Sequence, residues 1–483
     1  MPSETQPNIL LVLTDQQRPD WVGTADVPVR TPNYDRLVER GVEFSNAVCP
    51  APLCGPSRIC LAGGTEYDRC GVRGNNNYPG HRPTLYERLR REAGYRTIGI
   101  GDLDLIRSPY WGLDGGHQLD EIGFDDGIEI PGKNAMMKTY RNHIRSRAEG
   151  NAGSYDPEDV PPDVNPEPGH PANAYMAYLR ERGLLDTYVE DMLGRWIPER
   201  PVSAYSVTGP TSLPEEAYVD NWVGRHGVEH LREALEGQPW HLVVNFVGPH
   251  GPMDVTEEMH GWYRDPDVEF PEPIDPDGQL DSETHQEIRR NYAAMCENID
   301  RWLGCYLDIL EERGELDDTI VAFSSDHGEL LGDHGSWGKK SPLRASSGIP
   351  LGIAGPGIES RGAVEDPVGL LDLHPTFLEY AGVDRGDCDG VSLRPFLAGE
   401  TDSHRSAVRS GLQNWRMVFD GRHELIVGDD LADVNGFSED ASSPTLFDLH
   451  ADPEERENVA EDKPDVVEDL ADHLPEGFGT DAA

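Results

Sequence analysis

The sequence predicts an α/β fold built on a large, mostly parallel central sheet. Short runs of β-branched and leucine residues alternate along the chain with segments that have the apolar spacing of helices. This alternation is typical of strands joined by helical crossovers, which form parallel sheets. Beyond Gly399 the runs become short and strand-like, which indicates a small antiparallel sheet. We therefore expect one large domain over residues 1–400 and a C-terminal subdomain over residues 401–483.

Three of the predicted strands are followed by residues that can bind ligands. They are Asn8–Thr14 with Asp15, Trp240–Val247 with His250, and Thr319–Ser324 with Asp326 and His327. Because ligands of parallel sheets gather at the carboxyl ends of strands, three such endings together favour one site. The other predicted elements are helices Pro83–Ala93 and Arg289–Arg313 and strands Tyr95–Gly101, Pro350–Ala354, Met417–Phe419, His423–Val427 and Thr445–Phe447.

The stretch between Asp125 and Leu213 has few regular patterns and is rich in Pro, Gly, Asp and Asn. Such a composition is typical of loops. We interpret it as an insertion over the edge of the sheet that forms part of a substrate pocket.

The chain is extremely acidic, with a formal net charge of −48 over 483 residues. Its basic residues are almost all arginine, and the acidity runs through the whole chain without forming a tail. Concentrated salt screens such repulsion, so the composition favours a salt-adapted, haloarchaeal origin over an acidic protein of dilute medium. The same charge repels nucleic acid and anionic membrane surfaces, and we expect neither as a partner.

Cysteine usage and hydropathy indicate a cytoplasmic protein. The seven cysteines are odd in number within a large chain, which argues against a disulfide framework. The first residues lack a basic segment ahead of an apolar run, and no stretch approaches the roughly 20 apolar residues of a membrane span. The sequence leaves the oligomeric state open.

The densest chemical signal is Cys54-Gly55-Pro56-Ser57-Arg58, followed by Leu61-Ala62-Gly63. This Cys-x-Pro-Ser-Arg pattern resembles the signature of the sulfatase family, a branch of the alkaline phosphatase superfamily. In that family a maturation enzyme oxidises the cysteine to formylglycine, whose hydrated aldehyde is the nucleophile. The resemblance implies this role for Cys54 and implies that Arg58 holds the diol. The alternative is a buried cysteine in a turn.

Two further motifs resemble the metal-binding motifs of the family. Asp15-Gln16 follows the first predicted strand, and Asp326-His327-Gly328-Glu329 follows a later one. Sulfatases usually carry Asp-Asp at the first position, whereas phosphonate monoester hydrolases carry Asp-Gln. The resemblance implies one divalent ion (Ca²⁺, Mn²⁺ or Mg²⁺) bound by Asp15, Gln16, Asp326, His327 and residue 54. Either motif alone is compatible with a strand-to-turn cap.

Three more residues match active-site positions of these relatives. Lys339 follows Asp326 by thirteen residues, which implies that it neutralises the substrate's oxyanion. His250 lies in a Pro-His-x-Pro segment, whose histidine assists the leaving group. Asn75 lies where phosphonate monoester hydrolases have an active-site asparagine, although an Asn-rich turn explains it equally well.

The resemblance covers nearly the whole chain, with one departure. The segment Thr31–Leu37 resembles the family's TPNLDRL, and Leu446–Leu449 resembles its C-terminal LYDL. The implied fold is the alkaline-phosphatase-like sandwich with a small C-terminal sheet. After the strand Tyr95–Gly101, however, Asp102-Leu103-Asp104 replaces the usual Lys-x-His that contacts sulfate. Asp102 and Asp104 are therefore expected near the substrate. They either pair with arginines such as Arg73 or Arg107, or bind hydroxyls or a cationic group of the substrate. The alternative is that this loop has moved away from the site.

The leading functional prediction is the hydrolysis of sulfate esters of a small molecule or glycan. The alternative on the same scaffold is a phosphonate monoester or phosphodiester hydrolase, favoured by Gln16, His327 and the lost Lys-x-His. A third alternative is a catalytically silent binding protein, against which the retained Cys54 and metal motifs argue. The expected partners are the ester substrate and a formylglycine-generating maturation enzyme.

Overall fold

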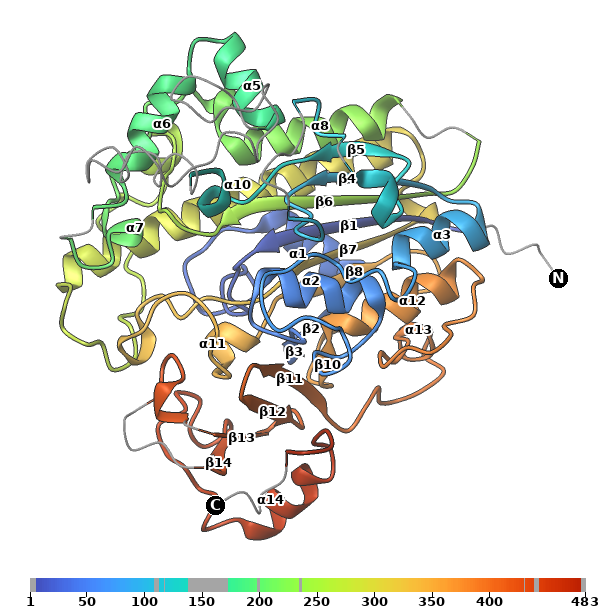
Figure 1. Cartoon of the computed structure of the whole chain (residues 1–483), viewed down its shortest axis with the longest axis vertical. Coiled ribbons are helices and arrows are strands. Elements are labelled where there is room, and N and C mark those ends of the chain that lie inside the picture. The colour runs from blue at the N-terminus through green and yellow to red at the C-terminus, as the bar shows by residue number, and fades with distance from the viewer. Residues whose placement is uncertain are drawn as a thin grey trace, which may run out of the picture.

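The computed structural model describes residues 6–107, 113–116, 118–137, 173–197, 200–233, 237–429, 431–437 and 443–478. Its centre is an eight-stranded sheet with the strand order β5-β4-β6-β1-β7-β8-β2-β9 (Figure 1). The first five strands in this order are parallel, and β8 then runs antiparallel to β7. The predicted α/β class with a mostly parallel sheet is confirmed. The strands are β1 Asn8–Asp15, β2 Val42–Phe44, β4 Arg96–Gly101, β5 Asp126–Glu129, β6 Trp240–Pro249, β7 Thr319–Ser325, β8 Leu351–Ala354 and β9 Gly362–Val364.

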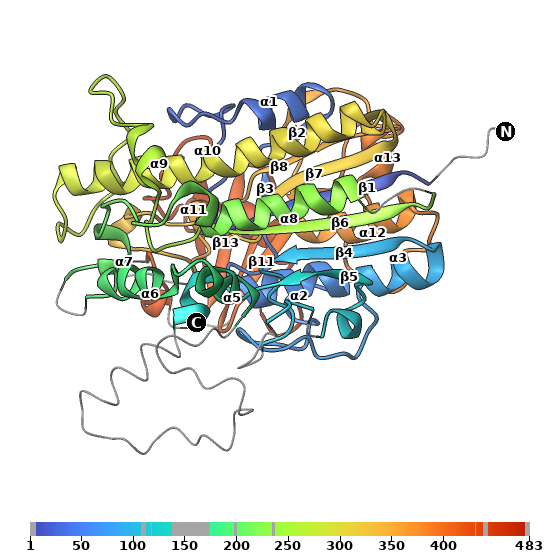
Figure 2. The ribbon, with the colours of Figure 1, turned by 90° about the horizontal axis from the view of Figure 1, so that it is seen from above.

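The central strand β1 is buried on both faces because helices cover both sides of the sheet (Figure 2). Its alternate side chains enter two separate cores: Ile9 and Leu11 on one side, Leu10 and Val12 on the other. This explains why the strand is a continuous apolar run rather than an alternating one. Helices α1 Pro32–Glu39, α8 Val219–Glu233 and α10 Ser282–Glu312 pack together on one face, and α2 Cys54–Gly63, α3 Leu85–Ala93 and α12 Leu373–Tyr380 on the other.

Helix boundaries follow capping residues more closely than apolar spacing. Helix α3 begins with a capping box between Thr84 and Glu87 and ends at Gly94, whose φ of 72° suits glycine. Helix α10 begins at Ser282, earlier than the predicted Arg289, because Asp281 caps it by accepting from Thr284 N at 2.9 Å. Its first two turns are mostly polar and carry no clear apolar pattern. The shorter helices are α5 Ala174–Glu181, α6 Leu185–Gly194, α7 Ser203–Ser206, α9 Glu257–Gly261, α11 Arg344–Ser347 and α13 Arg394–Leu397.

The C-terminal part forms the predicted small antiparallel sheet, at the lower end of Figure 1. Val418, Leu425 and Leu446 of this sheet pack against Val467 and Leu470 of the last helix, forming a core of their own. The domain boundary near residue 400 stays a prediction. The elements are β11 Val408–Leu412, β12 Trp415–Phe419, β13 His423–Gly428, β14 Thr445–Asp448 and α14 Pro464–Ala471, and a two-stranded ladder joins β3 Ala47–Val48 to β10 Val368–Gly369.

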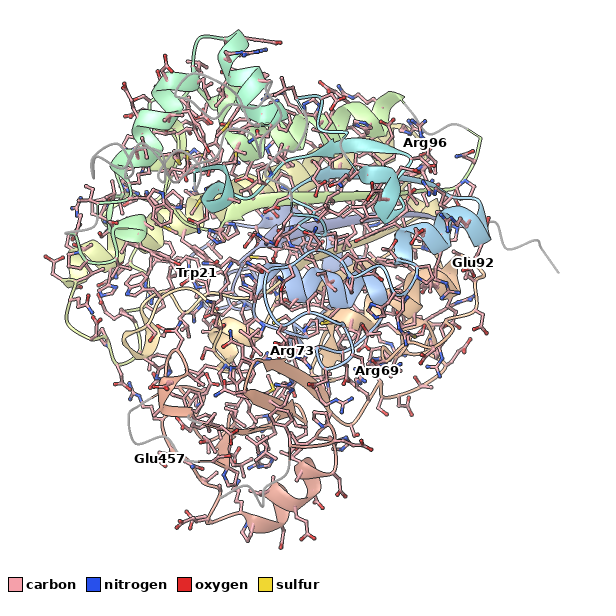
Figure 3. The ribbon with its side chains drawn as sticks, in the orientation of Figure 1. Trp21, Arg69, Arg73, Glu92, Arg96 and Glu457 are labelled. Atoms are coloured by element: carbon pink, nitrogen blue, oxygen red, sulfur yellow. The ribbon has the colours of Figure 1, made fainter. Side chains whose placement is uncertain are left out.

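Charged side chains cover the outside of the molecule, as Arg69, Glu92 and Glu457 illustrate (Figure 3). All seven cysteines carry free thiols. Among the described helices, none combines the length and the apolar character needed to cross a membrane. The predicted insertion contributes β5 and α5 to α7, but its residues 138–172 lie outside the described part of the chain.

Candidate active site

Two carboxylates meet where neighbouring parallel strands end. Asp15 is the last residue of β1, and Asp326 follows β7, with Thr14 and Ser325 paired across the two strands. The Asp326 N–H donates to the carbonyl of Thr14 at 3.1 Å, which fixes the second carboxylate beside the first. Both are buried, at 2% and 0% exposure. The parallel topology thus joins motifs that lie more than 300 residues apart.

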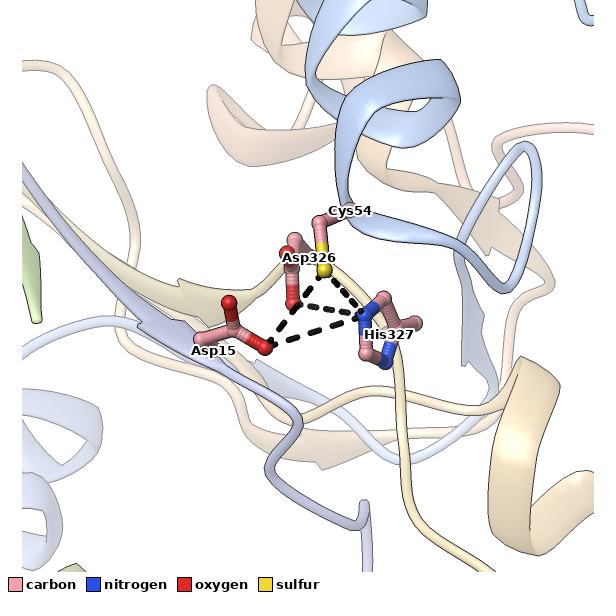
Figure 4. Close-up of side chains that lie close together, drawn as sticks. All are labelled: Asp15, Cys54, Asp326 and His327. Atoms are coloured by element: carbon pink, nitrogen blue, oxygen red, sulfur yellow. Dashed lines mark hydrogen bonds and ion pairs between the residues drawn. The ribbon is translucent and has the colours of Figure 1, made fainter. Parts of the chain in front are cut away.

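Cys54 reaches this pair as the first residue of α2 (Figure 4). Its Sγ lies 3.8 Å from Asp15 Oδ1 and 3.4 Å from His327 Nε2. Ligand-type atoms of Asp15, Cys54, Asp326 and His327 all lie within 4.8 Å of one another. The structure therefore brings together four of the five predicted metal-binding residues, and their role as ligands stays a prediction.

Gln16, the fifth predicted ligand, is buried beside them with a left-handed φ of 73°. Its side-chain nitrogen donates to the Tyr205 hydroxyl at 3.1 Å and to the Glu329 carboxylate. Its Oε1 has no hydrogen-bond partner among the described residues. A buried acceptor without a donor is costly, so this oxygen fits a role as a ligand for a hard cation.

Two cationic side chains balance the carboxylates. Arg58 donates to Asp326 Oδ2 at 2.9 Å, to Asp15 Oδ2 at 3.3 Å and to the carbonyl of Asp102. Lys339 Nζ lies 2.9 Å from Cys54 Sγ and 3.6 Å from Asp15 Oδ1. Burial alone would raise the pKa of Asp15, but the charge of Lys339, with His250 and Arg58, holds that pKa well below its usual range.

Burial and neighbouring charges disfavour the charged forms of Cys54, His250 and His327. Burial, followed by the charge of Asp15, raises the pKa of the Cys54 thiol well above its usual range. Burial lowers the pKa of His327 to about 4, and burial with the charge of Lys339 lowers that of His250 to about 3. An unmodified residue 54 is therefore a thiol, a much weaker nucleophile than a thiolate.

His250 and Asn75 both lie beside this cluster, and their roles stay predictions. His250 directly follows β6, and its Nδ1 lies 2.6 Å from the Gly251 carbonyl, which leaves Nε2 for other partners. Asn75 Oδ1 accepts from the Gly55 N–H at 3.0 Å. Asn75 thus contacts the backbone next to Cys54.

Asp102 and Asp104 are buried at 3% and 5% exposure, so the loop after β4 has not moved into solvent. Asp104 forms an ion pair with Arg107, whereas the Arg73 guanidinium donates to the Tyr67 carbonyl. Asp102 Oδ1 has no partner among the residues that the structure describes. Burial raises the pKa of both carboxyl groups.

Sequence reasoning missed three residues of this region. Glu329 is the last residue of the Asp326–Glu329 motif, but the motif gave it no role of its own. Tyr205 comes from α7, and Asn435 from the C-terminal part donates to the carbonyls of Trp337 and Lys339 at 3.1 and 2.9 Å. No local pattern marks either of these two, because each meets the site only through tertiary contacts.

Fold and site together define an α/β enzyme with a polar centre at the carboxyl edge of its sheet. A family model described as sulfatase matches residues 7–383, and one described as the C-terminal part of N-sulphoglucosamine sulphohydrolase matches residues 332–477. The chain belongs to the sulfatase family of the alkaline phosphatase superfamily, and it is a sulfatase-type hydrolase.

Known relatives are similar to this chain over nearly its full length. An arylsulfatase of Clostridium perfringens is 25% identical, with 94% of this chain and 90% of the relative covered. A choline-sulfatase of Rhizobium meliloti is 27% identical, with 94% and 83% covered. The solved phosphonate monoester hydrolase of Agrobacterium radiobacter has a TM-score of 0.71 at 23% identity, with 97% and 94% covered, and shows the shared fold.

Proposed function

We propose that this protein hydrolyses sulfate esters of a small molecule or glycan, with residue 54 oxidised to formylglycine by a maturation enzyme. The observation that carries the proposal is the position of Cys54 Sγ, 2.9 Å from Lys339 Nζ and among the side chains of Asp15, Asp326 and His327. A nucleophile at this point faces the cationic groups that an anionic ester requires.

Asp15, Gln16, Asp326 and His327 would hold one divalent ion next to residue 54. The donor set fits, because three of these residues offer oxygen, one offers nitrogen, and Gln16 Oε1 is buried without another partner among the described residues. This mixed set suits Mn²⁺ and Mg²⁺ as well as Ca²⁺. When bound, the ion supplies positive charge to the oxygens of the transferred group.

The residues of the chain account for the remaining steps. One hydroxyl of the hydrated aldehyde releases its proton to water and forms a bond to sulfur as the bond from sulfur to the leaving alcohol oxygen breaks. Lys339 stabilises the sulfuryl oxygens. His250 is neutral in the free site, and the charge of a bound anionic ester would favour its protonated form, so that Nε2 takes up a proton and passes it to the leaving alcohol. Loss of the proton from the second hydroxyl then expels sulfate and regenerates the aldehyde, a release that a serine ester lacks.

A second candidate is the hydrolysis of phosphonate monoesters or phosphodiesters. Gln16 and the replacement of Lys-x-His by Asp102 and Asp104 favour it. Sulfate esters, phosphonate monoesters and phosphodiesters each carry a single negative charge.

We further propose that Asp102 and Asp104 contact the alcohol part of the substrate through its hydroxyls or through a cationic group. The unpartnered Oδ1 of Asp102 supports this role, since among the described residues it leaves an acceptor for a substrate donor. The choline-sulfatase among the relatives is named for an ester whose alcohol is cationic, which favours the cationic form of the proposal.

The test combines mass spectrometry with a substrate panel. Peptides from the protein made in its native host should show the aldehyde or its hydrate at residue 54. Cys54→Ala should abolish turnover of aryl sulfate, phosphonate monoester and phosphodiester substrates assayed in high salt. Cys305→Ala, which removes an exposed thiol, is the matched control and should leave turnover unchanged. Fully active protein with only thiol at residue 54 would refute the mechanism.

A further inference from the structure

Glu329 is a fully buried carboxylate that the proposed mechanism does not use. Its Oε1 accepts from the backbone N–H groups of Leu331 and Gly338 at 2.8 and 2.6 Å. Its Oε2 accepts from the Tyr205 hydroxyl at 2.8 Å and from the side-chain nitrogen of Gln16. Four donors occupy the roughly four acceptor positions of a carboxylate, so this group has a defined orientation.

All but one of the polar atoms of Gln16 form hydrogen bonds with the described residues. Its N–H donates to Asp326 Oδ1 at 3.0 Å, and its carbonyl accepts from the Tyr292 hydroxyl at 2.6 Å. Its Nε2 faces Glu329 and the oxygen of Tyr205, while Oε1 alone has no partner among the described residues. The backbone is also fixed in a left-handed conformation, which non-glycine residues adopt mainly where surrounding contacts impose it.

The network determines which edge of the Gln16 amide faces Glu329. Both oxygens of Glu329 act as acceptors, since Oε1 accepts from two backbone N–H groups and Oε2 accepts the single hydrogen of the Tyr205 hydroxyl. Only the NH₂ edge of Gln16 can therefore face these two oxygens. The amide oxygen is then the edge that remains for a cation.

We propose that Glu329 is a positioning residue that sets the amide orientation of Gln16, so that Gln16 binds the metal through oxygen. Tyr205 completes the arrangement from α7. A carboxylate at position 16 would offer oxygen on both edges, whereas glutamine offers it on one, so glutamine needs such a partner. The inference rests on the metal site of the proposed function.

The same carboxylate also orders the segment that carries Lys339. The Gly338 N–H donates to Glu329 Oε1, and Lys339 is the next residue. One buried group thus fixes a candidate metal ligand on one side and the backbone beside a candidate catalytic cation on the other. Hydrogen-bonded partners of metal ligands commonly contribute about 10- to 100-fold in metal affinity.

The substitution Glu329→Gln separates the two contacts. The oxygen of the introduced amide can still accept from Leu331 and Gly338, so the Lys339 segment keeps its hydrogen bonds. The NH₂ group of that amide would oppose the NH₂ group of Gln16 and favour a flipped Gln16 amide, which withdraws Oε1 from the metal. Titration of the metal-free protein with MnCl₂ and CaCl₂, followed by calorimetry, should show about 10- to 100-fold weaker binding.

A second change tests the orientation directly. When Glu329→Gln is combined with Gln16→Glu, the carboxylate introduced at position 16 can accept from the amide at position 329 through one oxygen while the other oxygen faces the metal. Binding should return to within about threefold of the original protein, equivalent to less than about 1 kcal/mol. Glu424→Gln is the matched control, since Glu424 is also fully buried but lies on β13 in the C-terminal sheet, and it should leave metal affinity unchanged.

The outcomes separate this inference from the proposed function. Unchanged metal affinity in Glu329→Gln, or a double variant no better than the single one, would overturn the positioning role alone. Failure of the original protein to bind either ion would overturn the metal site and this inference together. Weakened binding in Glu329→Gln with recovery in the double variant would establish the orientation.

Discussion

Two groups of buried carboxyl groups lie at the same edge of the sheet, and they differ in their counter-charges. Asp15 and Asp326, after β1 and β7, share Arg58, and Asp15 also lies 3.6 Å from Lys339 Nζ. Asp102 after β4 and Glu129 on β5 each keep a buried oxygen without a partner among the described residues. Burial raises the pKa of Asp102 and Glu129 well above the usual range, whereas that of Asp15 is lowered.

The difference shows that the placement of cations, more than burial, determines which carboxylates are ionised. Asp15, whose pKa is lowered, is charged at neutral pH and suited to bind a cation. Ionisation of the second group costs free energy unless a positive partner arrives. The sheet edge therefore combines a group suited to a metal with a group that disfavours additional negative charge.

The largest expected effect comes from removing a cation of the first group. Lys339→Met should lower kcat about 100- to 1,000-fold, because it removes a charge that stabilises the transferred group. Lys340→Met is the control, since the neighbouring lysine is exposed and its loss should lower kcat less than about twofold. Steady-state assays of both variants in high salt check this prediction, and equal losses in the two would contradict it.

Arg58→Met should break the charge balance of the first group. It leaves Asp15 and Asp326 buried without their shared partner, so the free energy of unfolding of the metal-free protein should fall by about 3–5 kcal/mol. Arg40→Met removes only an exposed ion pair with Asp317 and should cost less than about 1 kcal/mol. Urea denaturation of the two variants measures the contrast. Similar losses for both would show that Arg58 does not balance these carboxylates.

Glu129 of the second group should make the stability of the protein depend on pH. The raised pKa of folded Glu129 means that its ionisation costs free energy of folding. This penalty is absent below the pKa of glutamate in the unfolded chain, about 4.3, and grows as pH rises towards the folded pKa. Glu129→Gln removes this penalty, so it should gain at least about 1 kcal/mol at about pH 8 and nothing at about pH 4. Thermal or urea unfolding across this range tests the slope, with exposed Glu121→Gln as the pH-independent control.

The smallest effect concerns substrate choice. Asp104→Asn should change the ratio of kcat/KM between a cationic and a neutral alcohol ester several-fold, with less effect on a small aryl ester. Removing one charge from a partly compensated pair with Arg107 explains the modest size. Unchanged selectivity across a varied panel would remove Asp104 from substrate binding.

Much of the site could be predicted because its residues lie at the ends of strands or within short motifs. Asp15, Cys54 and Asp326 lie in local patterns, and parallel topology then requires the strand ends to meet. The contacts of Tyr205 and Asn435 could not be predicted, because neither residue ends a strand of the large sheet or lies in a recognised motif. The charge state of Asp102 also depends on burial and on neighbours that the sequence does not place.

The strand pattern predicted the large sheet, but the start of α10 was placed too late. Apolar spacing identifies only the part of a helix that packs against a core, whereas Asp281 starts this one about two turns earlier. Capping residues therefore carry information that periodicity lacks.

The contacts of Asn435 make the completion of the Lys339 segment depend on the C-terminal part of the chain. Its amide donates to the carbonyls on either side of Gly338, yet it is made 96 residues after Lys339. A nascent chain that has already formed its central sheet still lacks these two hydrogen bonds. The two hydrogen bonds that flank Gly338 therefore form only after the C-terminal part of the chain has emerged, so the surroundings of Lys339 are completed after the sheet that carries Asp15 and Asp326.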